Sequence, residues 1–188
     1  MIQFRDGFYA DVRTEDRSRT TITYKSGALE EMKTRVERRA FIRVYDGKMW
    51  YYSSVTDLAH LQKTLDGLYD AATPNADIQN DPVVRRFERN RDTLLSFADS
   101  SVRDIPSKDK QALLLSYLPL LSEDSCITMP RGTYLDRNSL FRFRSSLGAD
   151  ITYDYQTCGL SFSCDMTEGE KKFSGHWQKG ATRFDELK

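Results

Sequence analysis

Residues 20–54, TTITYKSGALEEMKTRVERRAFIRVYDGKMWYYSS, decide the fold of this chain. Side chains alternate between apolar and polar along most of this stretch, which predicts strand, turn, strand, strand, turn and strand. Ser26-Gly27 marks the first turn, because glycine adopts a positive φ without steric cost. Asp46-Gly47 marks the second and is a strong signal for a two-residue hairpin. One buried face and one solvated face are typical of an antiparallel sheet.

The segments on either side extend this pattern. Residues 8–13 alternate in the same way and predict an earlier strand. After the quoted stretch, apolar residues recur every three or four positions, which predicts a helix with Thr56 as its N-cap and an end at Thr73-Pro74. The apolar face of this helix comprises Leu58, Leu61, Leu65, Leu68 and Ala72.

The middle of the chain predicts two further helices. Asp81-Pro82 reads as a capping residue followed by a proline at the first helical position, so we expect a helix from Pro82 to Ala98, although Arg91 interrupts its apolar face. The pattern is helical again from Lys108 to Leu121, with Ser107 as the expected cap.

The last third returns to alternating strands with turns at Gly148 and Glu168-Gly169. Its order of strands and turns resembles that of residues 20–54. We therefore expect fold class α+β, with two similar antiparallel β-sheet units joined by helices. The predicted organisation is an N-terminal sheet plus helix over 1–73, a helical connector over 74–122 and a second antiparallel sheet unit over 123–188.

Composition narrows the class of protein. The 188 residues include 28 basic and 28 acidic side chains, so no overall field attracts nucleic acid or an anionic membrane. The longest apolar runs, such as Ala112 to Leu115, are too short to cross a bilayer. The first residues lack an apolar stretch of signal-peptide length. We expect a cytoplasmic protein that binds neither nucleic acid nor membrane.

No motif marks a reaction. His60 and His176 fall in unrelated segments, and HExxH, GxSxG and glycine-rich phosphate loops are all absent from the sequence. Cys126, Cys158 and Cys164 form no CxxC pair and are expected to be reduced thiols. We therefore assign no catalytic residue, no metal ligand and no cofactor on this chain, and the substrate-binding residues are unknown.

Two clusters of arginines have aromatic neighbours, an arrangement found on surfaces that bind single-stranded nucleic acid. Acidic residues are interleaved with both clusters, which weakens that interpretation. The clusters comprise Arg35, Arg38, Arg39 and Arg43, and Arg85, Arg86, Arg89 and Arg91.

An ordered series of segments resembles the N-terminal region of the TldD/PmbA family, whose members were once called modulators of DNA gyrase. The series is YADVR from Tyr9, LEE from Leu29, IRVYDGK from Ile42 and TDL from Thr56. IPSKDKQALL over 105–114 and FSGHWQKGATRFDEL over 173–187 resemble later parts of the same region. The connector from Asp81 to Arg103 departs from the family pattern.

The resemblance implies a function that lies mostly outside these residues. Family proteins are more than twice this length and carry zinc in a C-terminal part, on an HExxxH helix and a later cysteine. They pair as homodimers or as heterodimers with a related subunit, and they degrade or process unfolded peptides. None of the zinc ligands corresponds to a residue of this chain, because Lys188 precedes the region that would carry them.

Three hypotheses follow. The first is an N-terminal, non-catalytic region of a zinc metallopeptidase subunit, in which a sheet edge binds unfolded peptide through backbone groups. We expect this region to form dimers through apolar sheet or helix faces. The alternative is a stand-alone peptide-binding or scaffold module that pairs with a catalytic partner. The third is an enzyme whose acid–base site carries no recognisable motif.

Overall fold

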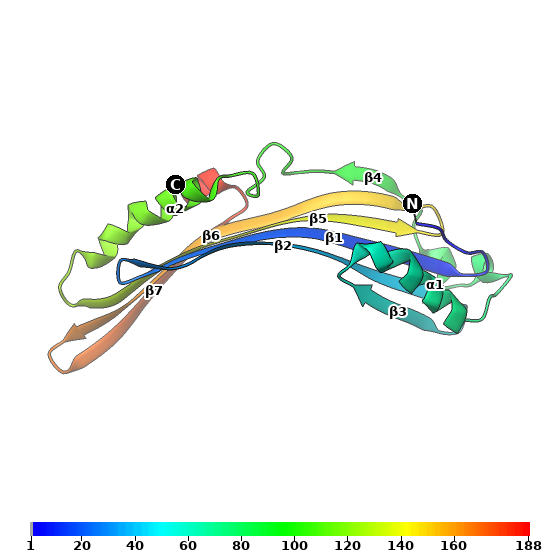
Figure 1. Cartoon of the computed structure of the whole chain (residues 1–188), viewed down its shortest axis with the longest axis horizontal. Helices are drawn as coiled ribbons and strands as arrows, with labels where there is room; N and C mark the ends of the chain where they lie inside the picture. The colour runs from blue at the N-terminus through cyan, green and yellow to red at the C-terminus, as the bar shows by residue number, and fades with distance from the viewer. Residues whose placement is uncertain (1) are drawn as a thin grey trace. The chain divides into compact units, whose positions relative to one another are not determined.

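The computed structural model describes residues 2–188, apart from the side chain of Ser122. Strands make up about half of the chain, and most of them are long (Figure 1). The strands are β1 (Tyr9–Lys25), β2 (Ala28–Tyr45), β3 (Trp50–Val55), β4 (Arg91–Leu94), β5 (Ile127–Ser145), β6 (Asp150–Glu168) and β7 (Lys171–Ala181). The α-helices are α1 (Leu61–Ala71) and α2 (Ser107–Tyr117), and the 3₁₀ helices are η1 (Leu58–His60), η2 (Ile78–Asn80), η3 (Val84–Arg86), η4 (Leu118–Ser122) and η5 (Phe184–Leu187).

All seven strands belong to one sheet of order β3-β2-β1-β5-β6-β4, with β7 also paired to β6. The pairs β2–β3 and β6–β7 are antiparallel, whereas the short β4 runs parallel to β6. The class α+β is therefore confirmed. The strands of the two sequence regions do not form separate sheets, because β1 of the first region pairs with β5 of the second.

The chain forms two compact units, each assembled from three segments. Unit 1 contains residues 1–16, 37–96 and 140–154, and unit 2 contains residues 17–36, 97–139 and 155–188. The strands β1, β2, β5 and β6 each contribute residues to both units. Every unit thus combines parts of both strand regions with one α-helix.

The core of unit 1 follows from two sequence periods. Alternate residues of β1 and β2 lie on the same face of the sheet, and residues four apart on α1 lie on the same face of the helix. These two apolar faces pack together and bury their side chains. The buried cluster contains Phe8, Ala10, Val12, Ala40, Ile42, Val44, Leu61, Leu65 and Tyr69.

The core of unit 2 lies between its strands and α2 (Figure 1). Ile22 of β1, Tyr134 of β5 and Leu160 of β6 are buried there together with Leu114 of α2. Phe184 and Leu187 of η5 pack against the same cluster. In unit 2, therefore, α2 and η5 cover one face of the strands, on the side to which the even-numbered residues of β1, β5 and β6 point.

The helix expected from Pro82 to Ala98 is wrong. This segment forms η3 and then β4, whose residues Arg91–Leu94 pair with Asp150–Tyr153 of β6. The expected apolar face does not exist, because Val84 is buried whereas Leu94 is 64% exposed. The helix expected from Lys108 is present as α2 and continues as η4, with Pro106 rather than Ser107 at the N-cap position.

The turns expected from glycine are present with one difference. Ser26 and Gly27 both have positive φ, 48° and 80°, as a two-residue hairpin turn requires. The connection at Asp46-Gly47 is longer than expected, because β3 begins only at Trp50. The Asp46 carboxylate accepts hydrogen bonds from the backbone N–H of Lys48 and Met49, which stabilises this four-residue loop.

Candidate peptide-binding edge

The candidate functional site is the outer edge of β2 over residues 28–36, which lies in unit 2. Strand β3 pairs only with Ala40–Tyr45 of β2, so its pairing ends before this stretch. Across residues 2–188, no other strand is paired to this side of β2. Backbone N–H and C=O groups along such an edge are available to another extended chain.

The sequence of this edge explains why no strand or helix covers it. All of residues 28–36 are exposed, including Leu29 at 48%, Met32 at 43% and Val36 at 55%. Charged residues and Thr34 separate Leu29, Met32 and Val36 along the strand. The stretch therefore has no continuous apolar face that would pack into a core.

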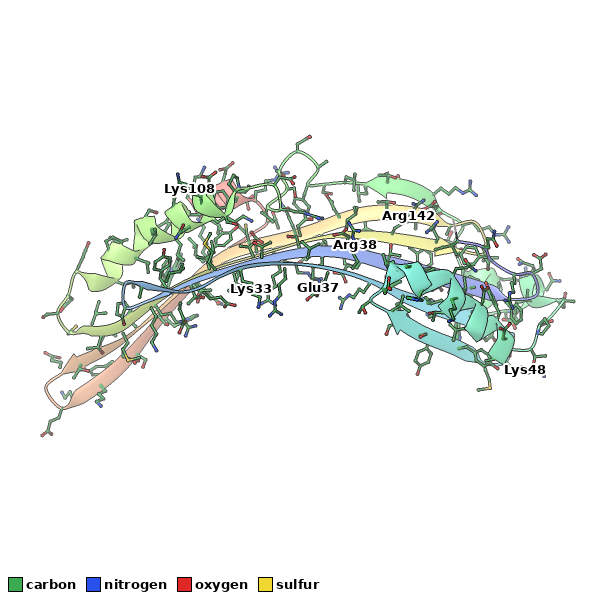
Figure 2. The ribbon with its side chains drawn as sticks, in the orientation of Figure 1. Lys33, Glu37, Arg38, Lys48, Lys108 and Arg142 are labelled. Atoms are coloured by element: carbon green, nitrogen blue, oxygen red, sulfur yellow. The ribbon has the colours of Figure 1, made fainter. Side chains whose placement is uncertain are left out.

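The two faces of the edge differ in chemistry. The Thr34 hydroxyl lies 3.3 Å from the hydroxyl of Thr20, which is buried on the α2 side of the sheet. Met32 and Val36 share that side with Thr34 by alternation. Lys33 and Arg35 point to the opposite side, and Figure 2 shows Lys33 on the side of the strands away from α2.

A shallow hollow of about 260 Å³ lies on this second side. Its charged residues are Arg19 of β1 and Glu31, Lys33 and Arg35 of β2. Among the described residues, none of these four side chains forms an ion pair or hydrogen bond. The hollow therefore carries three unpaired cations against one carboxylate. Its remaining lining residues are Thr21 and Leu135.

A second polar cluster in unit 2 is closed to solvent. The Lys110 ammonium of α2 lies 2.6 Å from the carboxylate of Asp136 on β5, and both side chains are at most 2% exposed. The same carboxylate accepts hydrogen bonds from Tyr134 Oη and the backbone N–H of Thr20, at 2.9 Å each. Burial, reinforced by the charge of Asp136, raises the pKa of Tyr134. This network fixes α2 on the sheet.

The two histidines do not come together in a site. His60 lies in unit 1, where its Nδ1 is 2.9 Å from a carboxylate oxygen of Asp57. His176 lies on β7 in unit 2, opposite Ser163 of β6, and is exposed. Asp57, rather than the expected Thr56, is the N-cap of η1, the 3₁₀ helix that leads into α1, and its side chain accepts a hydrogen bond from the Ala59 N–H.

All three cysteines are free. Cys158 is buried, and that burial raises the pKa of its thiol to about 11. A hydrogen bond with Asp124 raises the pKa of the Cys126 thiol above its ordinary value. Both thiols are therefore protonated near neutral pH and are poor nucleophiles and metal ligands.

Three arginines of the first basic cluster form ion pairs within unit 1. Arg38 binds Asp16, Arg39 binds Glu15 and Arg43 binds Asp11 in adjacent strands. The interleaved acids noted in the sequence include none of these partners, because cross-strand neighbours are distant along the chain. These pairs balance the charge of the cluster.

The described residues do not fit a zinc site. Within residues 2–188, no three His, Cys, Asp or Glu side chains are grouped so that they could hold a metal ion. The Asp57–His60 pair is exposed and belongs to no such group of three. We assign no catalytic step to these residues. None of the helices in the described part of the chain is long and apolar enough to cross a bilayer.

The fold defines an α+β domain built on one sheet of long strands. Residues 10–72 match the family model for PmbA/TldA metallopeptidase domain 1. The resemblance of the chain to the N-terminal region of the TldD/PmbA family is therefore confirmed. A search of curated proteins finds no match.

Solved structures share the fold at low sequence identity. A proposed modulator of a DNA gyrase from Thermotoga maritima is 16% identical, with a TM-score of 0.74 over 97% of this chain and 41% of that one. A second from Bacteroides thetaiotaomicron is 17% identical, with a TM-score of 0.72 over 94% and 41%. TldE from Thermococcus kodakarensis is 8% identical, with a TM-score of 0.67 over 93% and 40%. The chain thus spans about two fifths of each of these proteins.

From the sequence we named no substrate-binding residue, and this edge was not predicted. The available signal was the composition of residues 30–37, of which six are polar or charged and only Met32 and Val36 are apolar. A strand that packs into a core has a continuous apolar face, so this composition indicates an exposed edge, and all eight residues are exposed in the structure.

Proposed function

We propose that this chain is the N-terminal, non-catalytic region of a TldD/PmbA-like zinc metallopeptidase subunit, and that it binds unfolded peptide along the outer edge of β2. The observation that carries the proposal is the unpaired, fully exposed edge over residues 28–36. An extended peptide added to this edge forms backbone hydrogen bonds that do not depend on its sequence. Such binding suits a peptidase that acts on many unfolded substrates.

Zinc and the hydrolytic step belong to other parts of the proposed subunit or to its partner. The match to a metallopeptidase family and the coverage of about two fifths of the similar structures support this division. If the longer protein carries no zinc ligands, the alternative function is a peptide-binding scaffold that pairs with a catalytic subunit. Zinc-dependent cleavage by the longer protein separates these two functions.

N-methylated peptides test binding at an edge. Alternate amides of an extended peptide point to the same side, so methylating one alternate set blocks one edge of the peptide and leaves the other intact. The probe is a nine-residue neutral peptide of alternating Gln and Val, with a polyethylene glycol tail for solubility and a fluorescent label. Binding to the 188-residue chain is followed by fluorescence anisotropy.

We expect a peptide methylated on one alternate set to keep binding in at least one of the two versions, because a strand at a sheet edge uses only one of its sides. A peptide methylated on both sets should lose binding. Unchanged binding of the doubly methylated peptide would show that backbone pairing is not involved. Loss of binding by both singly methylated peptides would show a peptide paired on two sides, which an edge site does not provide.

We also propose that the chain forms a homodimer or a heterodimer with a related subunit. The exposed apolar side chains Phe173 and Trp177 of β7, at 54% and 50%, support a covered surface in the assembled protein. Multi-angle light scattering measures the mass directly. A monomer at all accessible concentrations would contradict self-association of this chain.

A further inference from the structure

We propose that the β2 edge selects extended peptides in which acidic residues alternate with apolar ones. This inference deepens the proposed function and rests on it. Neither the family match nor the similar structures indicate a preference of this kind. The preference follows from the different chemistry of the two faces that a bound strand would extend.

Strand β2 sets the directions in which the side chains of a bound peptide point. A peptide paired to residues 31–36 continues the sheet, so its side chains alternate between the two faces in step with those of β2. Residues on one face lie next to Lys33 and Arg35, and residues on the other lie next to Met32 and Val36. Opposite residues on paired strands have Cβ atoms about 4.5–5.5 Å apart, within reach of a direct contact.

One face of the β2 edge carries an excess of positive charge. Lys33 and Arg35, together with Arg19 on the neighbouring strand, surround the shallow hollow and have no ion-pair partner among the described residues. Glu31 supplies the single negative charge there. Aspartate or glutamate on this face of the peptide gains opposite-charge pairs, whereas lysine or arginine is repelled.

The opposite face of the β2 edge presents apolar side chains. Met32 and Val36 are 43% and 55% exposed, and their side chains point to the side that carries the buried core of unit 2. Valine, leucine or isoleucine on this face of the peptide removes part of that apolar surface from water. A peptide with acidic and apolar residues in alternation therefore matches both faces at once, in one register.

Three labelled nine-residue peptides test this preference, with Glu, Gln or Lys alternating with Val. We expect affinity for the 188-residue chain to fall in the order Glu, Gln, Lys. The Glu peptide should bind about five-fold more tightly than the Gln peptide, since each of two cross-strand ion pairs contributes a factor of roughly 1.5 to 5. Because these pairs are exposed, 0.5 M salt should largely remove the difference.

Charge reversal locates the contacts. The variant K33E/R35E should invert the order, so that the Lys peptide binds most tightly. The control K48E/K108E has the same change in net charge at two exposed lysines outside the edge, on the β2–β3 loop and the first turn of α2 (Figure 2), and should keep the original order. Inversion of the order by the control would show a general charge effect and would overturn the proposal.

A further pair of peptides tests the contribution of the apolar face. A peptide of alternating Glu and Ser should bind more weakly than the Glu and Val peptide, and M32S/V36S should abolish that difference. If the Gln peptide binds but the Glu peptide binds no better, the selectivity is wrong and edge binding stands. If none of the peptides binds, edge binding itself is wrong.

Discussion

Replacing Lys110 with methionine should destabilise unit 2 by leaving a buried carboxylate without its counterion. The Lys110 ammonium contacts Asp136 at 2.6 Å and the Thr20 hydroxyl at 3.3 Å, in a site that is almost fully buried. Methionine keeps the apolar stem but removes the charge. Breaking one partner of a buried ion pair costs about 3–5 kcal/mol.

The expected loss is about 3 kcal/mol, the lower end of that range. Asp136 keeps two hydrogen bonds, from Tyr134 Oη and the Thr20 N–H, which still solvate part of its charge. The double variant K110M/D136N should recover much of the loss, because an amide has no net charge and its oxygen still accepts from Thr20. The remaining cost is that of one altered hydrogen bond, about 1 kcal/mol.

Urea unfolding followed by fluorescence measures these free energies. The chain has two tryptophans, Trp50 in unit 1 and Trp177 in unit 2, so a W50F background reports unit 2 alone. The matched control is K108M, the same substitution at an exposed lysine two residues earlier on α2, with an expected effect within about 0.5 kcal/mol. A K110M variant as stable as K108M, or a double variant no more stable than K110M, would refute the reasoning.

Three further predictions concern single positions. Burial raises the pKa of Asp46, but hydrogen bonds from the backbone N–H of Met49, Lys48 and Thr73 and from Tyr51 outweigh that effect and hold the pKa below its usual 3.8. A carboxyl group with a depressed pKa stabilises the fold above its unfolded-state pKa, and this stability is lost as pH falls through its folded-state pKa. The variant D46N should therefore destabilise unit 1 at pH 7 and much less near pH 2. Thermal melts at the two pH values measure this difference. Cys158 should resist iodoacetamide at pH 7.5 until urea unfolds the chain, because its buried thiol has a pKa of about 11; peptide mass spectrometry showing rapid labelling of the folded chain would contradict its burial. G159A should destabilise the β6–β7 pair by about 1–3 kcal/mol, because the new Cβ would lie 2.9 Å from the Lys179 carbonyl oxygen, whereas G180A meets no atom within 4 Å and should not show this loss.

Much of the fold could be predicted from local patterns. The alternation over residues 8–12 and 40–44 and the four-residue spacing of Leu61 and Leu65 identify much of the core of unit 1, because each period defines a buried face. Tyr69, one turn further along the helix, was not predicted and is buried, whereas the expected Leu68 and Ala72 are only partly buried. Positive φ at Ser26, Gly27 and Gly169 agrees with the turns expected from the glycines. These features depend on neighbours close in sequence.

Features that depend on distant partners could not be predicted. Strand β4 has four residues and is held by Asp150–Tyr153 of β6, more than fifty residues further along the chain. The apolar side chains of that segment suggested a helix, but Leu94 remains exposed at the edge of the sheet. Pairing of the two strand regions into one sheet is likewise invisible in either region alone.

The candidate site was hidden for a similar reason. An exposed edge is defined by the strand that does not pair with it, and the sequence does not show where β3 stops pairing with β2. The position of the basic hollow also depends on Arg19 and Lys33 meeting across the hairpin. Only the register of β1 and β2 brings these two residues to one face.

Hydrogen–deuterium exchange tests the central proposal most directly, because it reads the backbone of the edge itself. Amides of residues 28–36 that point outward have no partner in the sheet and should exchange fast in the free chain. On addition of a saturating amount of the Gln and Val peptide, we expect slower exchange confined to this stretch and its neighbours. Unchanged exchange over residues 28–36, with protection elsewhere on the chain, would contradict the assignment of the binding site to this edge.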